Sequence, residues 1–464
     1  MNRVFKTKWS TAHQQYVVTD EHHATKGKAS KSAVAIAVAA LMSAGAASAA
    51  YMAPNAYHEE GFVATSKANL DAAKASWESE EYQKDWGLAA MNASSAYALG
   101  YHGQGVAVGV MDSGALLQKH PELAGDRFHA SHNKGQYGST GNRYPQGALP
   151  QFDGKYQQGQ NYDVTGDWTL NVNDSHGTHV TGTVGANRDG NEFHGVAWGS
   201  DVHVGNTGGT DDSNYGPFLD YQFFKNGWGQ LAQDLIAANG EKRGGVINNS
   251  FGTNTRVDAD YDSQKGNDGG TIGNMMEVNT VSDTEYEYFM FKQKYGDGNK
   301  NFVDAAYDAV KGTNVVQTIT TGNRDMVHPY YRALYPYFNP EAEKHWIAVA
   351  GLEKLKDGKY GLIKTFNEAG NAKWWTVVGP GDDIYSSAVV EGSYLIPGKK
   401  VNGKIEVPEG TPLGTPWYAA WGGTSMAAPH VTGAMSVLMS RYQDMSAIQV
   451  RDVMFTTARH TNLA

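Results

Sequence analysis

Residues 422–430 of the chain read GGTSMAAPH. The paired glycines predict a tight turn that a substrate backbone could approach closely. The broad apolar face of residues 425–442 predicts a helix that begins at this turn, and a helix N-terminus favours developing negative charge. Ser425 is therefore a candidate nucleophile, although serine at the start of a helix is also a common N-cap.

A serine hydroxyl needs a base to activate it, and the base needs a carboxylate to orient it. Both residue types lie upstream, because residues 174–184 read DSHGTHVTGTV and residues 106–114 read VAVGVMDSG. His176 is the candidate base. Asp112, at the end of a predicted strand, is the candidate orienting carboxylate. Asp174 is its rival by proximity, but residues so close in sequence rarely make this contact well.

Together with TTGN at residues 320–323, these segments resemble the motifs of the subtilisin-like serine peptidases, or subtilases. The order Asp, His, Ser is that of subtilisin. The resemblance extends from about residue 76 to the end of the chain. It implies a serine endopeptidase that hydrolyses peptide bonds through an acyl-enzyme, with Asp112, His176 and Ser425 as the triad. It also implies that the side-chain amide of Asn323 donates to the oxyanion.

The resemblance further implies where substrate binds. An extended peptide should pair with Ser250, Phe251 and Gly252, and Thr321 and Gly322 should form the opposite wall of the primary pocket. We expect a broad, apolar-leaning preference, which strict selection of Arg or Lys from a peptide library would contradict.

Two other classes of function are open. A zinc peptidase commonly carries His-Glu-x-x-His, whereas His176 and His179 are three residues apart with no intervening Glu, so we expect no metal ligands among them. The second alternative is a non-catalytic surface adhesin built on a peptidase scaffold, because a fold alone never guarantees activity. Such proteins usually lose a triad residue, and this chain keeps all three.

Composition narrows the possible partners. The net charge is −10, yet residues 1–32 are basic, so the rest of the chain is acidic and nucleic acid is not an expected partner. The absence of cysteine excludes disulfides and thiol catalysis. We expect no required cofactor. The resemblance makes a structural calcium ion possible, but Asp258, Asp260 and Asp262 only begin a calcium-loop pattern that then fails, so no ligands are assigned.

The N-terminus is typical of an exported protein. An apolar run at residues 33–42 follows the basic stretch, and small residues at 47–49 suit signal peptidase. The segment resembles the extended signal region of Gram-negative autotransporters, which implies export by the inner-membrane machinery through the periplasm to the cell surface or medium. We predict cleavage after Ala49, a flexible lead-in at 50–75 and a peptidase domain at 76–464. Autotransporters end in a translocator barrel, which we expect to be absent from this chain.

Short apolar runs alternate with helical patterns and predict an α/β fold. We expect the subtilisin-like three-layer arrangement, a mainly parallel central sheet flanked by helices, with active-site residues at the carboxyl ends of its strands. Long insertions at 125–168 and 253–300 are expected to be surface loops. The predicted strands are 106–111, 201–204, 245–247, 314–319, 346–350 and 375–378; the predicted helices are 87–99, 176–186, 219–239, 303–311, 425–442 and 448–457.

Overall fold

The computed structural model describes residues 6–10, 15–19, 57–58, 70–139, 156–209, 220–252, 279–286, 288, 300–401 and 403–458. The chain divides into two compact units, Met1–Ala53 and Pro54–Ala464. In the first, strand β1 (Lys6–Ser10) pairs antiparallel with β2 (Gln15–Thr19). The predicted domain limits of 1–49, 50–75 and 76–464 stay predictions.

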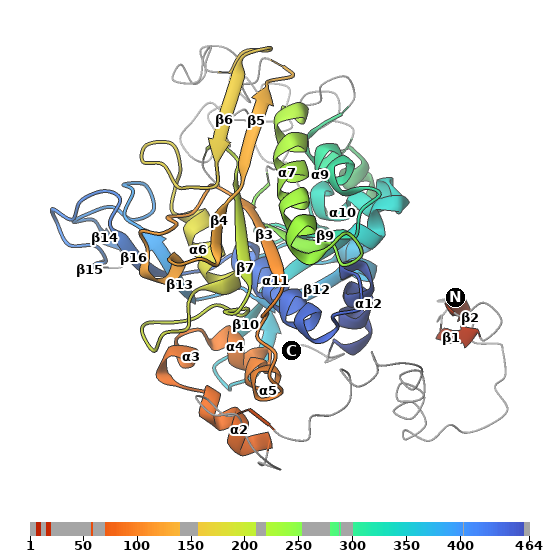
Figure 1. Ribbon diagram of the computed structural model, residues 1–464, viewed down its shortest axis with the longest axis horizontal. Coiled ribbons are helices and arrows are strands. Elements are labelled where there is room, and N and C mark those ends of the chain that lie inside the picture. The colour runs from red at the N-terminus through yellow and green to blue at the C-terminus, as the bar shows by residue number, and fades with distance from the viewer. Residues whose placement is uncertain are drawn as a thin grey trace. The chain divides into compact units, whose positions relative to one another are not determined.

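An eight-stranded sheet forms the centre of the second unit (Figure 1). Its order is β11-β10-β9-β8-β3-β7-β4, with β12 paired to β10, and every pair except β10–β11 is parallel. The strands are β3 (Ala107–Asp112), β4 (Phe128–Ala130), β7 (Asp201–Asn206), β8 (Gly245–Asn249), β9 (Val315–Thr320), β10 (Trp346–Lys354), β11 (Tyr360–Leu362) and β12 (Thr376–Pro380).

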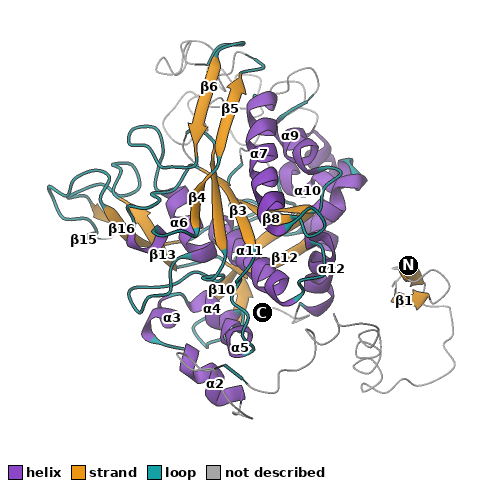
Figure 2. Cartoon of the chain, in the orientation of Figure 1, coloured by secondary structure: helices purple, strands orange, loops and turns teal. Residues whose placement is uncertain are grey.

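Helices cover both faces of this sheet, because its strands are apolar on both sides. Along β3, Ala107 and Met111 join the core under α7, α9 and α10, whereas Val108 and Val110 join the core under α6, α11 and α12. Figure 2 shows these helices around the strands. They are α6 (His176–Gly185), α7 (Tyr221–Asn239), α9 (Phe302–Val310), α10 (Tyr331–Phe338), α11 (Thr424–Arg441) and α12 (Ala447–Thr457). The predicted three-layer α/β fold is confirmed.

Smaller elements surround this frame. Further helices are α2 (Leu70–Trp77), α3 (Glu80–Lys84), α4 (Trp86–Ala90) and α5 (Ala93–Ala98), with 3-10 turns at Pro121–Leu123, Pro340–His345 and Gly370–Trp375. Three antiparallel pairs join β5 (His132–Gln136) to β6 (Asn161–Thr165), β13 (Ile384–Val389) to β16 (Pro416–Trp421), and β14 (Lys400–Val401) to β15 (Lys404–Ile405). No helix in the described part of the chain is long and apolar enough to cross a membrane.

Two expectations need correction. The helix predicted at 87–99 is two helices, α4 and α5, because Asn92 takes the left-handed conformation (φ 58°) and ends the first. The insertion at 125–168 is not all loop: where it is described it holds β4, β5 and β6, and Tyr162 of β6 packs on Phe223 of α7. Of the insertion at 253–300, the structure describes residues 279–286, 288 and 300, and residues 281–286 are helical, so this part is not loop either.

Glu122 is one of several acidic side chains that are buried within this frame. Glu122 is fully buried, and its Oε1 accepts a hydrogen bond from the hydroxyl of Tyr418 at 3.0 Å. Its Oε2 has no hydrogen-bond partner among the described residues. Burial raises the pKa of Glu122 to about 8, although the Tyr418 hydroxyl opposes the rise. The folded protein therefore holds a proton on this carboxyl at neutral pH.

This buried carboxyl predicts a pH dependence of stability. Below pH 4.5, which is the ordinary pKa of Glu, the Glu122 carboxyl is protonated in both the folded and the unfolded protein. The contribution of this proton to the free energy of unfolding is then fully present. This contribution to the free energy of unfolding is lost as the pH rises from 4.5 through about 8, by up to ~1.4 kcal/mol per pH unit. Glu122→Gln cannot ionise, so its free energy of unfolding should fall less than that of the wild type between pH 5 and pH 8. Denaturant titrations of both proteins at the two pH values measure the difference; equal falls would contradict a neutral Glu122.

Candidate active site

Asp112 and His176 meet at the end of β3. Asp112 is the last residue of β3, His176 is the first of α6, and the ring Nδ1 of His176 lies 2.8 Å from Oδ1 of Asp112. The same oxygen accepts the backbone N–H of Ser113 at 2.8 Å. Because a carboxylate only accepts, His176 donates from Nδ1, and the contact fixes the tautomer and the plane of the ring.

Asp174 bonds to the Ser113 hydroxyl and to the backbone at the start of α6. Its Oδ1 accepts the Ser113 hydroxyl at 2.6 Å and the backbone N–H of His176 at 3.1 Å. It therefore orders the backbone at the start of α6, while Asp112 contacts the ring. The geometry agrees with the preference for Asp112 over its neighbour in sequence.

Ser425 lies at the start of α11 and is joined to Ser250, the residue that follows β8. The Ser425 hydroxyl donates to the Ser250 carbonyl oxygen at 2.7 Å, and the Ser250 hydroxyl donates to the Ser425 carbonyl oxygen at 2.8 Å. The second bond has a clear cause. Pro429 stands four residues after Ser425 and has no N–H to bond that carbonyl within the helix.

The pairing of β3 with β8 brings these two pairs together. The strands are parallel, and Met111 lies opposite Asn249 in their register. The next residue in each segment is Asp112, which contacts His176, or Ser250, which contacts Ser425, so both contacts form at the carboxyl ends of neighbouring strands. Such strands lie about 4.8 Å apart. Three segments remote in sequence thus converge.

Asn323 lies against the same turn. Its Oδ1 accepts both the backbone N–H and the hydroxyl of Thr424, each at 2.8 Å, which directs Nδ2 away from that residue. The Cβ that Gly423 lacks would lie 3.4 Å from Nδ2 of Asn323 and 3.5 Å from the backbone N of Ser425. Both nitrogen atoms therefore lie close to the place that a side chain at residue 423 would occupy.

The expected substrate-binding residues flank this centre. Thr321 and Gly322 follow β9, and their carbonyl oxygens accept backbone N–H groups from residues 330 and 367, respectively. Gly252 is packed closely by Arg332, whose Cδ and Nε would lie 2.3 Å from a Cβ at residue 252. Phe251 is buried and lines a cavity beside Ser250.

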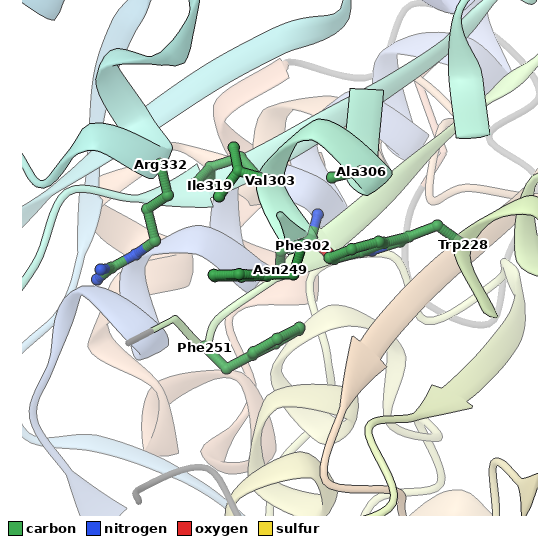
Figure 3. A pocket seen from close by; sticks show the side chains of 8 residues that line it. All are labelled: Trp228, Asn249, Phe251, Phe302, Val303, Ala306, Ile319 and Arg332. Atoms are coloured by element: carbon green, nitrogen blue, oxygen red, sulfur yellow. The ribbon is translucent and has the colours of Figure 1, made fainter. Parts of the chain in front are cut away.

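About one water molecule fits in this cavity, because its 240 Å³ of space between atoms includes open solvent. Figure 3 shows aromatic rings around it and Arg332 at one end. Most of its lining is apolar. The lining residues are Trp228, Asn249, Phe251, Phe302, Val303, Ala306, Ile319 and Arg332.

His179 is a packed core residue. Its Nε2 lies 3.1 Å and 3.0 Å from the carbonyl oxygens of Ile384 and Ala419, and its ring stacks on Trp421. Burial lowers the pKa of His179 to about 3, so the ring is neutral and Nε2–H donates to the carbonyls. With Nε2 used in this way and Nδ1 of His176 on Asp112, the two rings do not form a zinc-ligand pair.

Metal ligands for calcium are not evident in the described residues, which contain no group of three or more His, Cys, Asp or Glu side chains able to hold an ion. Asp258, Asp260 and Asp262 lie outside the described residues. The possible structural calcium ion stays a prediction.

Comparison with protein families agrees with the motifs. Residues 103–464 match the model described as the Subtilase family, and residues 1–50 match the Extended Signal Peptide of Type V secretion system. The second match confirms the predicted signal peptide and the export of the chain to the surface or medium of a Gram-negative bacterium.

Known secreted proteins are also similar in sequence to this chain. The chain is 30% identical over 404 residues to the "Extracellular serine protease" of Serratia marcescens, covering 84% of this chain and 33% of that protein. It is 24% identical over 402 residues to "Neisserial autotransporter lipoprotein NalP" of Neisseria meningitidis serogroup B, covering 80% and 32%. The chain thus spans about a third of the length of these relatives. The crystal structure of fervidolysin from Fervidobacterium pennivorans is similar with a TM-score of 0.47 and 23% identity, covering 83% of this chain and 44% of that one. With its family model matched over most of its length, the chain belongs to the subtilase family.

Proposed function

We propose that this chain is a serine endopeptidase that cleaves proteins or peptides through an acyl-enzyme. The observation that supports the proposal is the register of β3 and β8, because the Asp112–His176 and Ser250–Ser425 contacts both form one residue beyond the paired Met111 and Asn249. This arrangement would bring a nucleophile, a base and an orienting carboxylate to one edge of the sheet.

The proposed reaction starts when the Ser425 hydroxyl leaves the Ser250 carbonyl and turns toward His176. His176 takes the hydroxyl proton through Nε2 as Ser425 attacks the substrate carbonyl carbon, and then gives that proton to the leaving amine. Water hydrolyses the acyl-enzyme with the same base. Asp112 keeps the proton on Nδ1 and stabilises the imidazolium that forms.

The oxyanion would occupy the space beside Gly423. Nδ2 of Asn323 and the backbone N–H of Ser425 both lie close to it, and such preorganised donors stabilise the charge that develops in the transition state. The apolar-leaning substrate preference stays a prediction, because the cavity beside Ser250 has room for about one water molecule.

Covalent labelling tests the nucleophile. A fluorophosphonate probe should react with the wild-type protein at Ser425 and not with Ser425→Ala, because only an activated serine attacks the probe. Peptide mapping by mass spectrometry locates the label. A folded wild type that stays unlabelled would support the adhesin alternative, and activity that a chelator abolishes without labelling would indicate a metallopeptidase.

The pH profile tests the base. An unperturbed imidazole titrates near pH 6.5, and protonated His176 cannot accept the serine proton. Turnover should therefore decline below about pH 6. Initial rates on a neutral peptide substrate from pH 5 to pH 8 give the profile, and a rate that stays constant across this range would count against His176.

The oxyanion donor is tested by Asn323→Ala. Loss of one such donor typically lowers turnover by about 10²–10³-fold, with little change in KM because the contact forms in the transition state. Steady-state kinetics on the purified variant measure both constants. A variant that labels with the probe and turns over at the wild-type rate would remove Asn323 from the proposal.

A further inference from the structure

A second buried Asp–His pair lies on the helix that carries Ser425. His430 is five residues beyond Ser425 on α11, and its Nε2 lies 2.8 Å from Oδ2 of Asp85. Its Nδ1 lies 2.8 Å from the carbonyl oxygen of Met426, the residue next to Ser425. Both side chains of the pair are almost completely buried, at 0% and 2% exposure. Asp85 precedes α4 and stands outside the residues that match the subtilase model.

The two contacts of the ring indicate its charge. A carboxylate and a backbone carbonyl are both acceptors, so the ring donates from both nitrogen atoms and is an imidazolium. Burial alone would lower the pKa of His430, but the Asp85 carboxylate beside it outweighs this and raises the pKa above its usual value. The contact is therefore a buried ion pair, and removal of one partner would leave the other charge uncompensated.

Asp85 also organises α4. Its second oxygen, Oδ1, accepts the backbone N–H of Gly87 at 2.8 Å and so caps this short helix. A Cβ at Gly87 would lie only 2.3 Å from Nε2 of His430, so glycine is needed for the ring to approach. Residues 85–87 therefore pack closely against the His430 ring, with Asp85 bonded to it and Gly87 leaving room for it.

Trp86 contacts the segment at 381–382, which is bonded to the turn that carries Ser425. Its Nε1–H donates to the carbonyl oxygen of Asp382 at 2.8 Å, and its ring stacks on Tyr360. The residue before Asp382, Gly381, accepts the backbone N–H of Gly423 at 2.7 Å. Gly423 is the N-cap of α11 and lies close to the two proposed oxyanion donors. The residues at the start of α4 are therefore linked to the turn that carries Ser425 in two ways, through the contact of Asp85 with His430 and through the contact of Trp86 with Asp382.

We propose that Asp85 and Trp86 are positioning residues for Ser425, and that the active protein must retain the N-terminal segment that carries them. The inference rests on the proposed function. Because His430 bonds directly to the carbonyl of Met426, a shift of its ring moves the first turn of α11. Misplacement of a reacting group by about 1 Å can cost 10²-fold in rate.

The test compares Asp85→Ala with the wild type of the full chain. The variant should lower kcat and the rate of fluorophosphonate labelling about tenfold or more, with KM within about twofold, because the binding residues are untouched. Asp85→Asn can still cap Gly87 and donate to a neutral His430, so it should recover most of the rate. Glu80→Gln, an exposed acid-to-amide change in α3, is the matched control and should behave as the wild type.

Circular dichroism and thermal melting establish that each variant is folded. Wild-type kcat in folded Asp85→Ala would overturn the inference while leaving the proposed function intact. Should Asp85→Ala fail to fold, Trp86→Phe decides the matter: it keeps the stacking but loses the hydrogen bond, and about a fivefold loss of kcat is expected. Unchanged kcat in that variant would also overturn the inference. A wild type that does not label would overturn the proposed function and this inference with it.

Discussion

The parallel pairing of β3 with β8 is the constraint on which the candidate site depends. In a parallel sheet the carboxyl ends of neighbouring strands lie at one edge, and a slip of one residue would turn every side chain to the opposite face. The apolar residues of β3 alternate between two separate cores, so such a slip would move Met111 and Val110 into the wrong layers. Burial on both faces therefore fixes the register, which sets Met111 opposite Asn249, one residue before Asp112 and one residue before Ser250.

The site itself is assembled from backbone groups that regular structure leaves without partners. Pro429 cannot bond the carbonyl of Ser425, so that carbonyl accepts the Ser250 hydroxyl instead. Thr424 begins α11, so its N–H has no helical acceptor and donates to Asn323. Each bond satisfies a buried polar group and ties α11 to the end of a strand. The turn that carries Ser425 is thus held by hydrogen bonds from β8 and from the segment after β9.

Sequence reasoning predicted much of this arrangement, for identifiable reasons. Runs of β-branched residues predicted the strands of the sheet, and the resemblance located Asp112, His176 and Ser425 before any geometry was known. It could not find the contact of Asp85 with His430, because 345 residues separate them and neither belongs to a periodic pattern. The burial of Glu122 was equally hidden, since its environment is made by Tyr418 of a distant strand. Contacts between remote polar residues depend on tertiary packing that local patterns do not encode.

Three buried histidines near Ser425 show how partners, more than burial, decide what an imidazole can do. His179 faces carbonyl oxygens without a carboxylate, and burial keeps it neutral. His430 faces a carboxylate and a carbonyl, one at each nitrogen, and is held as a cation that cannot accept a proton. His176 has its Nδ1 on a carboxylate, which keeps the proton on that nitrogen, as a base that accepts the serine proton at Nε2 requires. The acceptors around each ring, and hence the loops and helix ends that supply them, are what separate a structural histidine from a proposed base.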